Sequence, residues 1–274
     1  RLAGFKIVLH WMPNLYGTTP DSDYADFARI FDDPAIRPDE MKIYPTALLR
    51  DTDLYTLWEQ GTHQPYEEAD LVDLLIRCKQ RTEPYCRINR VMRDIPAGYI
   101  VAGTTKSNLR QIVQRRMDDM GATCSCIRCR EVRSKGQLEI SDLLLDIVTY
   151  DTDTTREEFL QYVTPAGDLA AFLRLSLPDR PRDVIPIPEI REAAMIRELH
   201  VYGPAQELGT RREGAQHRGL GTRLLEIAGD RALAAGYGEL AVIAAVGTRE
   251  YYRERGFRDG SLYPMRSLGT TAQA

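Results

Sequence analysis

The hydrophobic pattern of this 274-residue chain changes once, near residue 121, and this change limits the folds that the chain can adopt. Before it, short apolar runs alternate with amphipathic stretches, which is typical of parallel strands connected by helices. After it, three long strand-like segments follow one another at 141–150, 157–164 and 169–177. The sequence therefore predicts an α/β protein of about two domains, at roughly 100–200 residues each.

In the first part we predict a buried strand at 4–9 and further strands at 41–44 and 85–91. One helix is predicted to begin at Thr19, and three others are predicted at 53–60, 67–81 and 107–120. Three strands are too few for a closed α/β barrel. The chain also starts at Arg1, inside what reads as a strand, so we expect a fragment of a longer protein. His63 precedes a turn and is expected at the surface. In the second part, the alternation continues with strands at 195–202, 240–245 and 263–266 and helices at 219–236 and 248–255.

The charge is unevenly distributed along the chain. Overall, 36 basic residues against 40 acidic ones give a net charge of −4, which by itself disfavours a nucleic-acid binder. Residues 77–135, however, contain 14 Lys and Arg against 5 Asp and Glu. Such a basic segment suits a polyanion, or is simply a solvated helix face. No apolar run approaches the ~18 residues of a membrane span.

Three cysteines lie within six positions, at Cys124, Cys126 and Cys129. Thiolates at this spacing can bind one soft metal ion, and tetrahedral zinc needs four ligands, for which His10 and His200 are candidates. A disulfide within the group is the alternative. An iron–sulfur cluster is disfavoured because no fourth cysteine lies nearby. The remaining cysteines fall within helix and strand patterns, which favours the reducing cytoplasm.

A glycine-rich segment, residues 216–222, separates a predicted strand from a long amphipathic helix. Its glycines, Gly219 and Gly221, allow backbone N–H groups to approach a phosphate at the helix N-terminus. Two glycines alone also fit an ordinary tight turn.

The spacing of Gln216, Gly219 and Gly221, preceded by the apolar segment 196–201, resembles the acetyl-CoA loop of GNAT acetyltransferases. Residues 246–257 are similar to the last helix and bulge region of that family. The resemblance implies that the strand before the loop pairs with the pantetheine arm, and that Tyr252, with Tyr251 beside it, acts as the acid for the leaving thiolate. Packing of the tyrosine pair against the sheet is the alternative. The implied acetyl-CoA-binding residues are Glu198, Leu199, His200, Val201, Gln216, Gly219, Leu220, Gly221, Thr222 and Tyr252.

Five segments, at 10–17, 37–46, 85–96, 126–132 and 197–203, closely resemble the catalytic subunits of the Elongator family, in family order and over nearly the whole chain. Trp11 and Tyr16 are local departures. The resemblance implies three parts. Residues 1–120 are the later part of a partial radical-SAM α/β barrel, 121–136 a zinc-binding connection, and 137–274 a GNAT acetyltransferase domain.

The family modifies the wobble uridine of transfer RNA, so the resemblance implies an acyltransferase that uses acetyl-CoA and S-adenosylmethionine to form 5-carboxymethyluridine. It implies binding of the tRNA anticodon stem-loop, and assembly as a homodimer or with other Elongator subunits. The cysteine motif of the four-iron four-sulfur cluster is absent, so we expect this chain to lack the radical step and to keep the acetyl-CoA site. The candidate tRNA-binding residues are Arg87, Arg90, Arg93, Lys106, Arg110, Arg115 and Arg116.

Two other functions stay open. A protein lysine acetyltransferase would need a general base, for which Glu198 is the nearest candidate. A non-catalytic tRNA-binding scaffold would show no affinity for acetyl-CoA.

Overall fold

A computed structural model of the chain describes residues 1–92, 95–132, 140–179, 185, 187–202 and 219–269. The chain divides into two compact units. The N-terminal unit comprises Ile7–Cys129, and the C-terminal unit comprises Arg130–Ala274 together with Arg1–Lys6. The boundary after Cys129 places the cysteine segment in the N-terminal unit.

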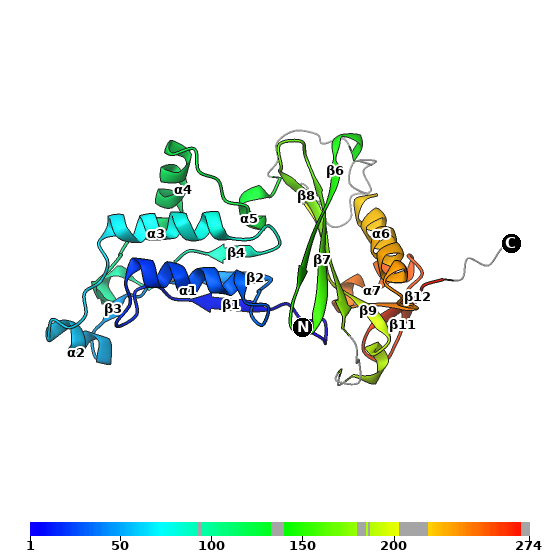
Figure 1. Cartoon of the computed structure of the whole chain (residues 1–274), viewed down its shortest axis with the longest axis horizontal. Helices are drawn as coiled ribbons and strands as arrows, with labels where there is room; N and C mark the ends of the chain where they lie inside the picture. The colour runs from blue at the N-terminus through cyan, green and yellow to red at the C-terminus, as the bar shows by residue number, and fades with distance from the viewer. Residues whose placement is uncertain (93–94, 133–139, 180–184, 186, 203–218, 270–274) are drawn as a thin grey trace. The chain divides into compact units, whose positions relative to one another are not determined.

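The N-terminal unit is built on a three-stranded parallel sheet of order β1-β2-β4 (Figure 1). Its strands are β1 (Val8–Trp11), β2 (Glu40–Ile43) and β4 (Arg87–Arg90). A separate antiparallel pair joins β3 (Leu48–Leu49) to β5 (Ile100–Ala102). The helices are α1 (Pro20–Asp32), α2 (Asp53–Glu59), α3 (Glu68–Arg81), α4 (Leu109–Asp119) and the short α5 (Ile127–Arg130).

Local sequence signals explain the two longest helices of this unit. At the N-terminus of α1, Thr19 and Ser22 form a capping box, and Pro20 occupies the first turn between them. In α3, Leu71, Leu75 and neighbouring apolar residues form a buried stripe, and the helix packs against α1. The expected helix at 67–81 is therefore confirmed almost to the residue.

Two expectations for this region are wrong. The first strand covers Val8–Trp11 instead of 4–9, because Gly4 adopts a positive φ of 84° and Phe5 is 61% exposed. Residues 1–6 group with the other unit. His63 is buried, with 5% of its surface exposed, and burial lowers the pKa of its imidazole.

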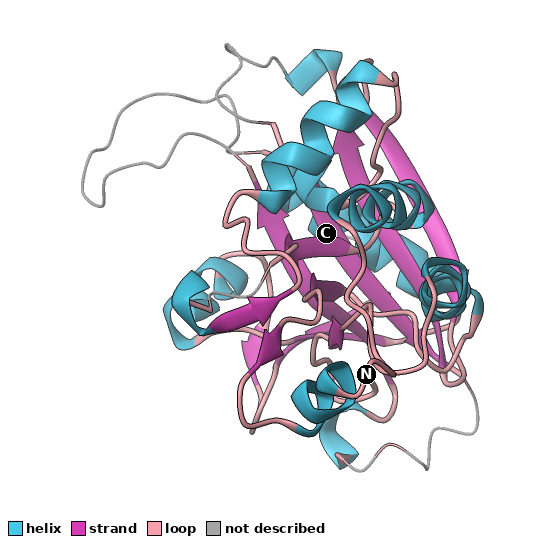
Figure 2. Ribbon diagram, turned by 90° about the vertical axis from the view of Figure 1, so that its left-hand side faces the viewer, coloured by secondary structure: helices cyan, strands magenta, loops and turns pink. Residues whose placement is uncertain are grey.

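The C-terminal unit contains a seven-stranded sheet of order β11-β12-β10-β9-β8-β7-β6 (Figures 1 and 2). Strands β6 to β9 form an antiparallel meander, β9 and β10 are parallel, and β10 and β12 are antiparallel. The strands are β6 (Leu144–Asp151), β7 (Thr155–Val163), β8 (Leu169–Pro178), β9 (Ala193–Val201), β10 (Glu239–Val242), β11 (Arg258–Asp259) and β12 (Pro264–Ser267). The helices are α6 (Leu220–Ala234) and α7 (Arg249–Arg253).

The core of this unit lies between the sheet and α6. The helix buries Leu220, Leu224 and Ala228 against apolar residues of β7 to β10. On the opposite face, Leu2 of the segment 1–6 packs against a smaller apolar cluster that contains Met195 and Tyr263. Both faces are thus covered, and all ten residues of β8 are buried. None of the helices that the structure describes has the length and apolar character needed to cross a membrane.

Candidate cofactor groove and cysteine cluster

Strand β9 carries a bulge at the point where its neighbour β10 ends. β10 runs beside Ala193–Ile196 only, and the Ile243 amide then donates to the Ile196 carbonyl at 3.1 Å. On the other side, Arg174 of β8 lies opposite Glu198, and the next β8 residue lies opposite Ile196, so Arg197 is an extra residue in β9. A bulge bends and twists its strand and is often found beside active sites. Beyond it, Glu198–Val201 continue along β8, past the end of β10.

The N-terminus of α6 lies close to this bent part of β9. A Cβ atom on Gly221 would collide with the Tyr251 hydroxyl and would lie 3.7 Å from Val201 Cγ2. Glycine at this position therefore allows close approach of α6, β9 and α7. The structure brings together Val201, Gly221 and Tyr251, three residues that the sequence assigns to one site. Gln216 lies outside the described residues.

The two tyrosines of α7 have different surroundings. Tyr251 is stacked under the Arg255 guanidinium, whose Cζ lies 3.6 Å from the ring centroid, and Arg255 Nε donates to Thr222 Oγ1 at 3.0 Å. Tyr252 is 6% exposed and packs edge-to-face on Tyr251 and Phe257. Burial raises the pKa of both phenols, that of Tyr252 to about 12. Tyr252 is therefore protonated at neutral pH, as a proton donor must be, and it also fills part of the core.

The side chains of the predicted β9 segment divide between the two faces of the sheet. Leu199 and Val201 pack against the core beneath α6. On the other face, the His200 ring contacts the rings of Phe172 and Tyr202, at centroid distances of 5.8 and 4.3 Å.

Both carboxylate oxygens of Glu198 accept hydrogen bonds from cations. Arg174 Nε donates to Oε2 at 2.9 Å, and Lys6 Nζ donates to Oε1 at 3.1 Å. The Arg174 guanidinium is itself buried, with Cζ 5.1 and 5.4 Å from the ring centroids of Phe159 and Phe172. Glu198 is therefore held as an ion-pair partner of two cations, which is a poor arrangement for a general base.

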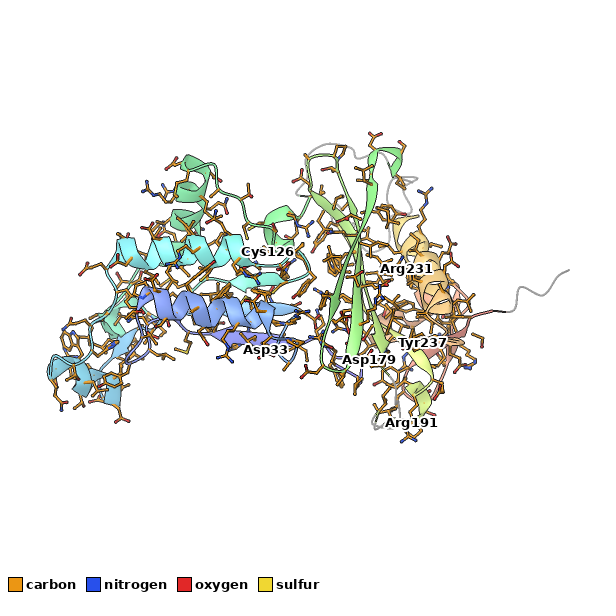
Figure 3. The ribbon with its side chains drawn as sticks, in the orientation of Figure 1. Asp33, Cys126, Asp179, Arg191, Arg231 and Tyr237 are labelled. Carbon is orange, nitrogen blue, oxygen red and sulfur yellow. The ribbon has the colours of Figure 1, made fainter. Side chains whose placement is uncertain are left out.

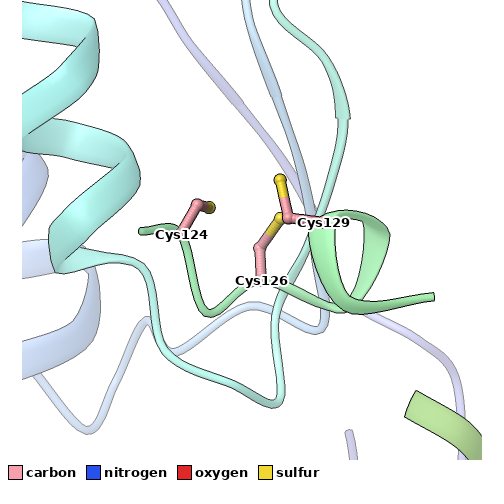
Figure 4. A group of neighbouring side chains, drawn as sticks. All are labelled: Cys124, Cys126 and Cys129. Atoms are coloured by element: carbon pink, nitrogen blue, oxygen red, sulfur yellow. The ribbon is translucent and has the colours of Figure 1, made fainter. Parts of the chain in front are cut away.

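The three clustered cysteines converge in the N-terminal unit (Figure 4). α4 ends in a Schellman motif, in which Gly121 has a φ of 65° and the Ala122 amide donates to the Met117 carbonyl at 2.8 Å. This turn leads into the cysteine loop. The Ile127 amide then donates to the Cys86 carbonyl at 3.0 Å, which attaches α5 beside β4.

The sulfur atoms of Cys124, Cys126 and Cys129 all lie within 4.8 Å of one another. Sulfur ligands of one tetrahedral zinc ion, at 2.3 Å from the metal, are about 3.8 Å apart, so the trio fits a soft metal ion. All five cysteines are free thiols, which contradicts the alternative of a disulfide within the group. Among the described residues, neither His10 nor His200 belongs to this donor group. His10 instead packs edge-to-face on Tyr44.

Lys79 is a member of this cluster that the sequence reasoning missed. Its side chain is fully buried in α3, and Nζ lies 3.3 Å from Cys129 Sγ. Hydrogen bonds from Cys124 and Cys126, together with the Lys79 charge, lower the pKa of the Cys129 thiol. The cluster therefore stabilises a thiolate, the form that binds metal. The only sequence signal was a lysine on the buried stripe of α3, next to Cys78.

The candidate tRNA-binding residues differ in exposure. Arg90, Lys106, Arg115 and Arg116 are exposed, whereas Arg87 is half-buried. Arg110 is also half-buried; its Nη2 donates to the Ile88 carbonyl at 2.7 Å, and burial lowers its pKa. Arg93 lies outside the described residues.

Comparison with known proteins shows one family match within the N-terminal unit and several relatives that are similar over nearly the whole chain. Residues 38–119 match the model of the Radical_SAM C-terminal domain. A tRNA uridine(34) acetyltransferase of Dehalococcoides mccartyi (strain CBDB1) is 38% identical over 94% of this chain and 57% of its own length. Elongator complex protein 3 of Bos taurus is 35% identical over 97% of this chain and 49% of its own length. The chain thus spans about half the length of the curated relatives that it matches.

A solved structure extends the similarity to the fold. The archaeal Elp3 of Methanocaldococcus infernus, with an N-terminal deletion, superposes with a TM-score of 0.86 at 33% identity. The match covers 97% of this chain and 64% of that one. The predicted fold class, a mixed α/β chain that contains the C-terminal part of a radical-SAM barrel, is confirmed. Over nearly its whole length the chain is therefore similar to proteins named Elongator complex protein 3 and tRNA uridine(34) acetyltransferase, and to the archaeal Elp3 structure.

Proposed function

We propose that this chain carries the acetyl-CoA site of an enzyme that modifies the wobble uridine of tRNA to 5-carboxymethyluridine. The observation that supports this most strongly is the convergence of three elements in the C-terminal unit: the bent end of β9, the N-terminus of α6 and Tyr251 of α7. A thioester with a long pantetheine arm and phosphates at its other end would match a free strand end followed by a helix N-terminus. Relatives named tRNA uridine(34) acetyltransferase support the RNA substrate.

Each part of the groove has a role in this proposal. The amides around Leu220 and Gly221, at the N-terminus of the 15-residue helix α6, bind the phosphates. The backbone of Leu199–Val201, past the end of β10, pairs with the pantetheine arm. Tyr252 donates a proton to the thiolate that leaves when the thioester is cleaved, and Tyr251 orders the groove through Thr222 and Arg255.

The cysteine trio would hold zinc beside β4, with a structural role. The two other cysteines, Cys78 and Cys86, are both buried and too few to supply three ligands of an iron–sulfur cluster. No radical step is therefore assigned to the residues of this chain. S-adenosylmethionine and the cluster would supply the radical in the complete enzyme.

A lysine acetyltransferase is less well supported. That reaction needs a base to deprotonate an ammonium group, and both oxygens of Glu198 are engaged by Arg174 and Lys6. A pure scaffold would have no use for the close approach at Gly221.

The RNA contacts would come from exposed basic residues of the N-terminal unit, chiefly Arg90, Lys106, Arg115 and Arg116. Phosphate contacts of this kind position an RNA without reading its sequence. We also propose a cytoplasmic protein whose partners are the tRNA anticodon stem-loop and either a second copy or other Elongator subunits.

Acetyl-CoA hydrolysis by the full chain tests the proposal, with and without tRNA, at low and moderate salt. We expect hydrolysis that rises when tRNA is added, and a smaller rise at higher salt because phosphate contacts are screened. Hydrolysis that is indifferent to tRNA but accelerated by a lysine peptide would favour protein acetylation. Absence of acetyl-CoA binding would leave the scaffold.

A further inference from the structure

A buried ion pair lies directly under the β9 bulge. Arg197, the extra residue of the bulge, has a side chain with 0% exposure, and its partner Glu157 on β7 has 1%. Arg197 Nε and Nη2 donate to Glu157 Oε2 at 3.0 and 2.8 Å. Such a pair is costly to bury, and its net contribution to stability is often small. Stability alone is therefore a weak reason for this pair.

The pair connects four segments of the C-terminal unit. Glu157 Oε1 accepts hydrogen bonds from Thr155 Oγ1 at 2.7 Å and from Ser176 Oγ of β8 at 2.6 Å. Arg197 Nη1 donates to the carbonyl of Phe5 at 3.3 Å. The extra residue of β9 is thus tied to β7, to β8 and to the segment 1–6, while the residues that follow it run past the end of β10.

We propose that Glu157 and Arg197 are positioning residues that fix the bulge and thereby hold the backbone of Leu199–Val201 in place for the pantetheine arm of acetyl-CoA. The planar guanidinium of Arg197 forms charge-assisted hydrogen bonds to the Glu157 carboxylate only in one orientation. These bonds therefore fix the register of β9 relative to β7 and β8. The proposal rests on the acetyl-CoA function proposed above. It adds that two side chains on the face of the sheet opposite to α6 determine the position of the backbone that binds the pantetheine arm.

Removing one charge alone would unbalance this buried group, in which Arg1 Nη1 also lies 3.9 Å from Glu157 Oε2, and could unfold the chain. The test therefore uses the double variant Glu157→Gln/Arg197→Met, in which the Gln oxygen still accepts from Thr155 and Ser176. The conservative variant Arg197→Lys keeps the charge and tests for rescue.

A matched control lies on the neighbouring residue of β7. Glu158 points to the other face, is 3% exposed and pairs with Arg231 of α6, which is labelled in Figure 3. The control variant Glu158→Gln/Arg231→Met removes an ion pair from the same strand, with a 36% exposed arginine, for which no contact with the bulge is seen in the described part of the chain.

The experiment measures binding by calorimetry with two probes, acetyl-CoA and adenosine 3′,5′-bisphosphate, on the full chain, after circular dichroism has shown each variant to be folded. We expect the double variant to bind acetyl-CoA at least tenfold more weakly while its affinity for the bisphosphate stays within twofold. Arg197→Lys should lose less than the double variant, and the control should bind both probes as the wild type does.

Three results would overturn the inference. Unchanged acetyl-CoA affinity in the folded double variant would refute the positioning role and leave the acetyl-CoA function intact. Equal losses for both probes, or the same loss in the control, would show a general effect on stability. No binding by the wild type would refute the proposed function itself.

Discussion

Replacement of Tyr252 by phenylalanine separates the chemical role of this residue from its packing role. The ring is 6% exposed and packs on Tyr251 and Phe257 at centroid distances of 5.3 and 5.5 Å, contacts that phenylalanine keeps. A positioned general acid typically contributes 10²–10⁴-fold to a rate. We therefore expect Tyr252→Phe to slow thioester cleavage by about 10²-fold or more, or at least ~2.7 kcal/mol in activation free energy, with unchanged acetyl-CoA affinity.

The raised pKa of Tyr252 gives a second prediction, which concerns the pH dependence of the free energy of unfolding and is independent of the rate of thioester cleavage. Burial raises this pKa from 10.0 to about 12, and two units correspond to about 2.7 kcal/mol. Because the folded state favours the neutral phenol, the wild type has its full stability below pH 10 and loses up to that amount as the pH rises towards 12. Tyr252→Phe lacks this loss, so its free energy of unfolding should fall less steeply between pH 9 and 11.5.

The assay for the first effect monitors the release of CoA in a single turnover by chromatography, and Tyr251→Phe is measured in parallel to separate the contributions of the two hydroxyl groups. Unchanged cleavage by Tyr252→Phe would refute the assignment as proton donor and leave a core residue only. A loss in affinity equal to the loss in rate would instead indicate that the ring shapes the groove.

The other predictions concern the loop, the metal and the RNA. Gly221→Arg should abolish acetyl-CoA binding in a titration, because its side chain fills the close approach at the α6 N-terminus; undiminished binding would contradict the loop assignment. Cys126→Ser should lower the zinc content measured by elemental analysis from one ion per chain to well below half, whereas full retention would place the metal elsewhere. Arg115→Ala/Arg116→Ala should weaken tRNA binding and reduce its logarithmic salt slope by about 1.5. Arg29→Ala, an exposed arginine on α1, should leave both values unchanged.

The regular elements were largely predictable because their signals are local. The apolar stripe of α3 and the three long strands of the second half occur where the periodicity places them. The cysteine trio was also predictable, since its members are close in sequence and α5 brings them together.

The remaining features depend on contacts between distant residues. Nothing near Arg197 in the sequence indicates an extra residue in β9, because the bulge is defined by the register with β8. The buried Lys79 donates a hydrogen bond to Cys129, 50 positions away. The apolar run at 4–9 contains Gly4, which has a positive φ. The need for glycine there comes from a distant residue, because a Cβ atom on Gly4 would lie 3.1 Å from Met195 Sδ.

The order of the units along the chain has a consequence for synthesis and folding. The C-terminal unit is discontinuous, and the whole N-terminal unit, residues 7–129, is inserted between its first six residues and the rest. At the usual 5–20 residues per second, the segment 1–6 is made roughly 7–28 s before the first strand of its sheet, β6. Folding of the inserted unit first would shorten the loop that must close, and so reduce its entropic cost. A single proteolytic cut in the inserted unit would leave the segment 1–6 on its own sheet only through non-covalent contacts.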